Sequence, residues 1–189
     1  YGGAEGFEEE KRAVEVSMEA GVNLFDTAAM YSVGAAEKRL GELTRGKDVI
    51  IATKYPSGFS FRVEDFPKEV EATLARLGRD SIDLYQHHYP NAKMSIPALM
   101  DRIADAVEAG KIKAVGVSNY SVEQMREAYT SLTKRGIPLA SNQVEYSLLH
   151  RKPEVDGVLD ACRELGITLM AYSPLAGGLL TGKYSAQNR

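Results

Sequence analysis

The fold is decided by the stretch Lys111-Ile112-Lys113-Ala114-Val115-Gly116-Val117-Ser118-Asn119. Its centre is almost continuously apolar, and its last two residues are polar. A strand that reads this way is buried on both faces, which is typical of a parallel sheet covered by helices. Gly110 directly precedes the stretch, and a glycine is expected where a helix ends in a left-handed turn. The stretch therefore predicts a helix-to-strand connection in an α/β protein.

The same unit, a helical segment followed by a short apolar strand, occurs six times. The expected strands are Val22–Thr27, Val49–Lys54, Ile82–His88, Ile112–Ser118, Leu139–Val144 and Ile167–Ser173. Each helical segment ends at a glycine, and these are Gly21, Gly46, Gly78, Gly110, Gly136 and Gly166. We interpret the glycines as helix caps rather than as phosphate-binding residues. Helix starts are expected at Pro67, Pro97, Ser121 and Pro153. In the sixth helical segment the apolar face is expected at Val155, Val158, Leu159 and Leu165.

Two architectures use such units, the doubly wound open sheet and the (β/α)₈ barrel. A dinucleotide-binding open sheet normally carries G-x-G-x-x-G after its first strand. Here Phe25 is followed by Asp26-Thr27-Ala28-Ala29-Met30-Tyr31, so we predict the barrel. A barrel of this type has eight strands and about 250 residues. We therefore expect residues 1–189 to be a single barrel domain with six of its eight units, truncated at both ends, from a protein of roughly 280–330 residues.

Composition excludes several other classes of protein. The 189 residues include 26 acidic and 23 basic side chains, so the net charge of −3 offers no excess of positive charge for nucleic acid. No window approaches about 18 uninterrupted apolar residues, so we expect no membrane span. The single cysteine, Cys162, cannot form an internal disulfide and is expected to pack in the core. This cysteine usage suits the cytoplasm or another reducing compartment such as a plastid stroma.

Polar side chains stand at or near the carboxyl ends of all six expected strands. They are Asp26 with Tyr31 after it, Lys54, Gln86-His87-His88, Ser118-Asn119, Asn142-Gln143 with Glu145, and Tyr172-Ser173. In a barrel these ends meet at one rim, so together they predict one site. A lysine beside a tyrosine would stabilise its phenolate, and an aspartate would keep that lysine charged. A histidine could hydrogen-bond a substrate oxygen. This set suits the reduction of a carbonyl to an alcohol.

The segments around these residues resemble the aldo-keto reductase superfamily over nearly the whole chain. They are Gly21–Ala28 with Tyr31, Ile51–Lys54, Ile82–His88, Lys111–Asn119, Asn142–Ser147, Ala171–Leu175 and Gly178–Tyr184. The resemblance implies an NADPH-dependent carbonyl reductase that acts on a small-molecule aldehyde or ketone. NADH remains an open choice of cofactor.

The resemblance also implies a role for each matching residue. Tyr31 would be the general acid, Lys54 and Asp26 the pair that lowers its pKa, and His88 the group that orients the substrate. His87 would point toward the helix layer instead. The nicotinamide is expected on Ser118, Asn119, Gln143 and Tyr172, and the pyrophosphate on Ser173, Leu175, Gly177 and Lys183. No metal site is expected.

Two other functions stay open at this point. One is a cofactor-binding sensor or regulatory subunit with little turnover. The other is a lyase in which Lys54 forms a Schiff base. The aromatic residues Phe59, Phe61 and Phe66 either line a substrate pocket or pack beneath the loop after Lys54.

Overall fold

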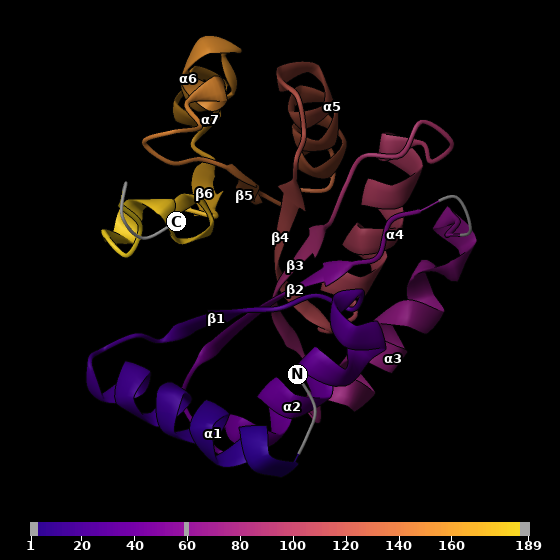
Figure 1. Cartoon of the computed structure of the whole chain (residues 1–189). Helices are drawn as coiled ribbons and strands as arrows, with labels where there is room; N and C mark the ends of the chain where they lie inside the picture. The colour runs from indigo at the N-terminus through magenta and orange to yellow at the C-terminus, as the bar shows by residue number, and fades with distance from the viewer. Residues whose placement is uncertain (1–3, 59–60, 186–189) are drawn as a thin grey trace.

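The six apolar runs form six strands of one parallel sheet. The computed structural model describes residues 4–58 and 61–185 (Figure 1). The strands are β1 Leu24–Asp26, β2 Ile50–Tyr55, β3 Ile82–His87, β4 Ile112–Ser118, β5 Leu139–Glu145 and β6 Thr168–Tyr172. Their order in the sheet is the order in the chain, β1-β2-β3-β4-β5-β6. The sheet curls as part of a (β/α)₈ barrel, which confirms the predicted fold class.

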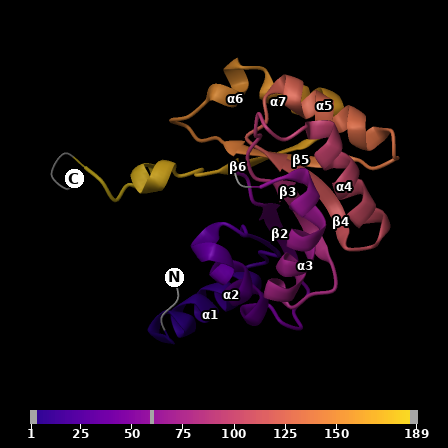
Figure 2. The same ribbon diagram turned by 90° about the vertical axis from the view of Figure 1, so that its right-hand side faces the viewer.

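Helices connect the strands and cover the outer side of the sheet. They are α1 Ala4–Glu19, α2 Ala35–Leu43, α3 Phe66–Leu77, α4 Ile96–Glu108, α5 Val122–Thr133, α6 Lys152–Val155 and α7 Val158–Leu165. Short 3₁₀ turns are η1 Tyr31–Gly34, η2 Val63–Asp65 and η3 Ala176–Thr181. Figures 1 and 2 show α3, α4, α5 and α7 side by side along one side of the curled sheet. None of the helices in the described part of the chain is long and apolar enough to cross a membrane.

The predicted helix boundaries are confirmed, with one exception. The six glycines at the helix ends have φ between 63° and 87°, the left-handed conformation that glycine adopts without steric cost. Ser121 caps α5 by accepting a hydrogen bond from the Gln124 backbone N–H at 3.3 Å. The sixth helical segment, however, is split in two, because Gly157 has φ 84° and separates α6 from α7. Val155 is consequently 87% exposed, so its expected place on the apolar face is wrong.

Strand residues alternate between the helix layer and the barrel interior. Val115 and Val117 are fully buried in the core that the sheet forms with the helices. Between them, Gly116 faces the interior, where a Cβ atom would lie 2.3 Å from Ser141 Oγ and 2.8 Å from Gln86 Cγ. Interior positions are therefore polar and tightly filled below the carboxyl ends of the strands.

Cys162 packs in the core as predicted, and two of the three aromatic residues after Lys54 pack as well. Cys162 is 2% exposed, and its Sγ lies 3.6 Å from Met125 Sδ. Phe61 and Phe66 pack against the Tyr55 ring, with centroids 6.2 and 5.1 Å from it. This supports the packing interpretation for both residues, whereas Phe59 lies outside the described residues.

Candidate active site

Lys54 is a fully buried lysine that points into the barrel interior. In the register of the sheet Asp26 lies opposite Ala52, so Lys54, two residues further along β2 on the same face, reaches past the end of β1. Its Nζ donates to Asp26 Oδ2 at 2.5 Å and to the Thr27 carbonyl oxygen at 2.8 Å. Burial lowers the pKa of Lys54, and the Asp26 carboxylate opposes that effect. The ion pair with Asp26 thus favours the charged amine against the effect of burial.

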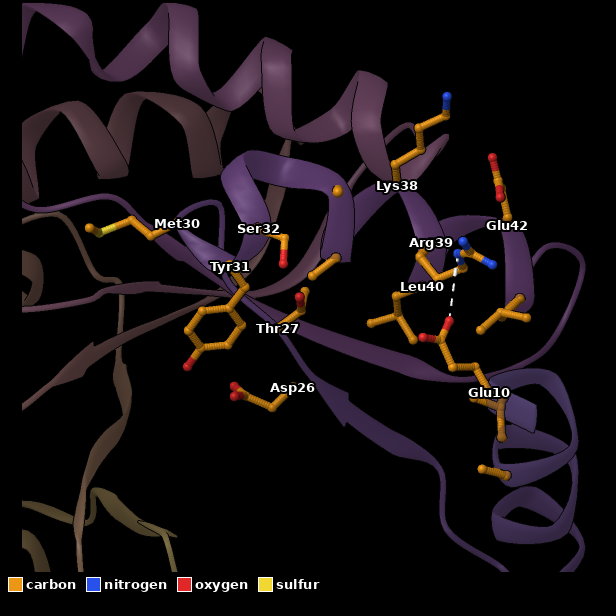
Figure 3. A pocket seen from close by; sticks show the side chains of 15 residues that line it. Glu10, Asp26, Thr27, Met30, Tyr31, Ser32, Lys38, Arg39, Leu40 and Glu42 are labelled. Atoms are coloured by element: carbon orange, nitrogen blue, oxygen red, sulfur yellow. Dashed lines mark ion pairs between the residues drawn. The ribbon is translucent and has the colours of Figure 1, made fainter. Parts of the chain in front are cut away.

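Tyr31 stands beside this pair, at the start of η1. The Lys54 Nζ lies 5.3 Å from the centroid of the Tyr31 ring. The two residues that follow, Ser32 and Val33, have left-handed φ angles of 47° and 54°, so the backbone turns sharply after the tyrosine. Tyr31 and Asp26 line a cavity of about 940 Å³ that extends toward α1 and α2. Figure 3 shows the two side chains close together on its wall.

The pKa of Tyr31 differs in direction from the sequence-based expectation. Desolvation raises it, and the negative charge of Asp26 raises it further, whereas Lys54 is not among the causes. The expected lowering is therefore wrong for this arrangement, because desolvation and the Asp26 charge both favour the neutral phenol. A raised pKa keeps the hydroxyl protonated at neutral pH, which is the state that a proton donor needs.

His88, the fourth predicted catalytic residue, directly follows the end of β3. It is 8% exposed, and its ring lies edge-on to Tyr31 with centroids 5.8 Å apart. Burial, reinforced by the positive charge of Lys54, lowers the pKa of His88 to about 4. The imidazole is therefore neutral at pH 7 and can offer a hydrogen bond to a substrate oxygen, but it is not a proton acid at that pH.

His87 points to the opposite side of β3, as predicted. Its Nδ1 forms a 2.7 Å hydrogen bond with the Tyr120 hydroxyl in the helix layer. The side chain is 1% exposed, and its Nε2 has no hydrogen-bond partner in the described part of the chain. Burial lowers the pKa of His87 to about 4.

These two histidines should make the protein sensitive to acid. Their pKa values are lowered in the folded state, so below about pH 6.5 the unfolded chain binds protons that the folded chain does not. His87 alone is expected to lower the free energy of unfolding by roughly 2 kcal/mol between pH 7 and pH 5. Urea unfolding of wild type and His87→Phe at both pH values checks this, since the variant should lose less stability. An equal loss in the two proteins would contradict it.

Four residues expected at the nicotinamide lie together at the ends of β4, β5 and β6. Asn119 Nδ2 donates to Ser118 Oγ at 3.0 Å, and the Tyr172 hydroxyl donates to Asn119 Oδ1 at 3.1 Å. Ser118 Oγ in turn donates to the Gln143 carbonyl oxygen at 2.8 Å. The Gln143 side chain extends across the interior and donates from Nε2 to Asp26 Oδ1 at 3.0 Å. The structure thus links the expected nicotinamide residues to the expected catalytic pair.

The residues expected at the pyrophosphate are not part of this group. Ser173, Leu175, Gly177 and Lys183 lie on the segment around η3, which has no buried residues. Figure 2 shows this yellow segment extending away from the sheet. Ser173 and Gly177 have left-handed φ angles of 51° and 64°, so the segment is a succession of tight turns.

Two features of the site were missed from the sequence. Tyr89, which directly follows His88, stacks on its ring with centroids 4.9 Å apart and is 46% exposed. Its position next to a strand end was the available signal. The contact between Gln143 and Asp26 had no signal, because it joins residues 117 positions apart. Among the described residues no group of three or more His, Cys, Asp or Glu side chains is placed to hold a metal ion.

A curled parallel sheet with ionisable residues at the carboxyl ends of its strands is typical of (β/α)₈ barrels, whose active sites lie at that face. The model of the aldo/keto reductase family matches residues 2–189, and the chain belongs to that family. It is 37% identical to the chloroplastic pyridoxal reductase of Arabidopsis thaliana, over 93% of this chain and 53% of that protein. It is 30% identical to the L-glyceraldehyde 3-phosphate reductase of Escherichia coli, over 97% of this chain and 58% of that protein.

The similarity extends to solved structures. A glycerol dehydrogenase from Gluconobacter oxydans superposes with a TM-score of 0.87 at 31% identity, over 100% of this chain and 60% of that one. The chain therefore spans between half and two thirds of the length of these relatives.

Proposed function

We propose that the protein containing this chain reduces an aldehyde or ketone to an alcohol, with NADPH as the hydride donor and Tyr31 as the general acid. The observation that carries the proposal is the buried Lys54, ion-paired with Asp26 and placed next to the Tyr31 ring. In the reduction the carbonyl carbon gains a hydride while its oxygen takes the Tyr31 proton. The positive charge of Lys54 stabilises the phenolate that is left.

The residues near the pair fit a nicotinamide cofactor, which would supply the hydride when bound. A carboxamide has one acceptor and two donor hydrogens. The Ser118 hydroxyl and the amides of Asn119 and Gln143 offer the complementary donors and acceptors at one place. We assign the carboxamide to these three residues, the ring face to Tyr172, and the pyrophosphate to the segment from Ser173 to Lys183. His88, neutral and close to Tyr31, would orient the substrate oxygen.

Schiff-base chemistry at Lys54 is disfavoured by the same contacts. A lysine that attacks a carbonyl must be neutral, whereas the hydrogen bonds to Asp26 and to the Thr27 carbonyl oxygen favour the charged amine. Borohydride trapping in the presence of substrate should accordingly give no covalent adduct on Lys54.

An assay with the intact protein tests the proposed reaction. The substrates are 4-nitrobenzaldehyde, pyridoxal and glyceraldehyde 3-phosphate, each supplied with NADPH and, separately, with NADH. We expect oxidation of NADPH that depends on the carbonyl compound, and the NADH arm decides the choice of cofactor. Tight NADPH binding, seen as quenched protein fluorescence, without turnover on any carbonyl compound would overturn the proposal in favour of a regulatory subunit.

A further inference from the structure

Asp26 is the last residue of the short strand β1. Strand β1 has only three residues and pairs with β2 alone in the described part of the chain. The carboxylate of Asp26 has to hold the Lys54 amine in place, so the contacts that position this carboxylate matter for the pair.

Two side chains from different strands hold the two oxygens of this carboxylate. Lys54 Nζ from β2 binds Oδ2 at 2.5 Å, and Gln143 Nε2 from β5 binds Oδ1 at 3.0 Å. These are the hydrogen bonds to the Asp26 side chain within residues 4–58 and 61–185. Because β5 is four strands from β1 in the sheet order, the Gln143 contact crosses the barrel interior rather than following the sheet.

Gln143 is itself firmly held. The residue is only 5% exposed, and its strand β5 pairs with β4 on one side and with β6 on the other. Its backbone carbonyl oxygen accepts hydrogen bonds from Ser118 Oγ at 2.8 Å and from the Asn119 N–H at 2.9 Å. The Asp26 carboxylate is thus tied to a buried residue that hydrogen bonds hold in place.

The hydrogen bond to Asp26 uses the amide nitrogen of Gln143 and leaves its amide oxygen as an acceptor. An ionised carboxylate only accepts hydrogen bonds, so the amide nitrogen of Gln143 must face Asp26. The Gln143 Oε1 makes no hydrogen bond within the described residues. It can therefore accept an N–H from a nicotinamide carboxamide while Nε2 still holds Asp26.

We propose that Gln143 is a positioning residue for the catalytic pair, holding Asp26 across the barrel so that Lys54 stays aligned with Tyr31. This role is additional to any contact between Gln143 and the cofactor, and its catalytic part rests on the proposed carbonyl reduction. Without the amide, Asp26 can rotate about its side-chain bonds, and the charge of Lys54 is then less well directed at the phenol.

The test compares Gln143→Met, which keeps the length but loses the hydrogen bond, with Gln143→Glu, which places a second carboxylate against Asp26. Single-turnover hydride transfer is measured at saturating NADPH and aldehyde and at alkaline pH, so that neither cofactor affinity nor a shared proton affects the comparison. We expect Gln143→Met to lower the rate about tenfold and Gln143→Glu to lower it by at least about another tenfold. In an Asp26→Asn background the two variants should become equal, because the repulsion is gone.

A measurement without cofactor separates the inference from the proposed function. In urea unfolding, the extra destabilisation by Gln143→Glu over Gln143→Met should also disappear in the Asp26→Asn background. If the protein reduces carbonyl compounds but the extra destabilisation persists in the Asp26→Asn background, the positioning role is overturned. The positioning role is also overturned if both variants only weaken NADPH binding and leave hydride transfer at the wild-type rate. If the extra destabilisation disappears in the Asp26→Asn background but the protein reduces no carbonyl compound, only the proposed function is contradicted.

Discussion

Replacing Tyr31 by phenylalanine should lower kcat for carbonyl reduction by at least about 100-fold, which is the usual contribution of a positioned general acid. The substitution removes the proton donor and keeps the ring. The contacts of that ring with the Lys54 amine and with His88 can therefore persist. The expected result is a protein that binds NADPH as the wild type does and fails in the chemical step. Steady-state kinetics with 4-nitrobenzaldehyde and NADPH titration by fluorescence measure the two properties separately.

Tyr89→Phe is the matched control for this substitution. It removes a phenol hydroxyl from the neighbouring tyrosine, which is similarly exposed and stacks on His88. Only a small change in kcat is expected, because the proton in our proposal comes from Tyr31. If Tyr31→Phe retained the wild-type rate, or if the two variants lost activity equally, the assignment of the acid would be wrong.

Most of the fold could be predicted because its signals are local. A strand buried on both faces and a glycine at a helix end are each visible within about ten residues, so the six units could be found from the sequence. The break between α6 and α7 was missed because Gly157 lies within a segment of helical periodicity. The first strand is shorter than expected, since β1 begins at Leu24 rather than Val22.

The site was predictable to the extent that it follows from strand register. Parallel pairing brings the ends of β1, β2 and β3 together, so Asp26, Lys54 and His88 could be expected to meet. The direction of the Tyr31 pKa could not be derived, because it depends on the balance between desolvation, Asp26 and Lys54. The Gln143 contact depends on the curvature of the whole sheet, which no local pattern records.

A second buried charge cluster was also missed, and it supports the wall behind Lys54. Glu37 on α2 is fully buried and accepts hydrogen bonds from Thr53 Oγ1 at 2.6 Å and from Arg76 Nε at 2.5 Å. Arg76 on α3 also donates to Glu69 at 2.5 Å. The cluster joins α2, β2 and α3, and Thr53 is the residue next to Lys54 in the sequence.

Arg76→Met should be the most destabilising single substitution that we consider. It leaves the Glu37 carboxylate buried without its cationic partner, a change that typically costs about 3–5 kcal/mol. Urea unfolding at neutral pH measures this loss. Arg126→Met is the control: it breaks a bidentate ion pair with Glu164 on the exposed surfaces of α5 and α7 and should leave the midpoint of unfolding unchanged.

The pH dependence of the Arg76→Met defect identifies its cause. Burial raises the pKa of Glu37 in the folded protein, against the opposing effect of its hydrogen bonds with Thr53 and Arg76. Removing Arg76 takes away one of those opposing contributions, so the pKa rises further. A group with a raised folded-state pKa favours folding when protonated, and that contribution is lost as the pH rises through the folded-state pKa. The difference in stability between wild type and Arg76→Met should therefore shrink as the pH is lowered.

For the same reason Glu37→Gln, added to Arg76→Met, should recover much of the lost stability at neutral pH. A defect that is independent of pH and is not relieved by Glu37→Gln would mean that Arg76 acts through packing of its side chain on α3, not through the buried charge.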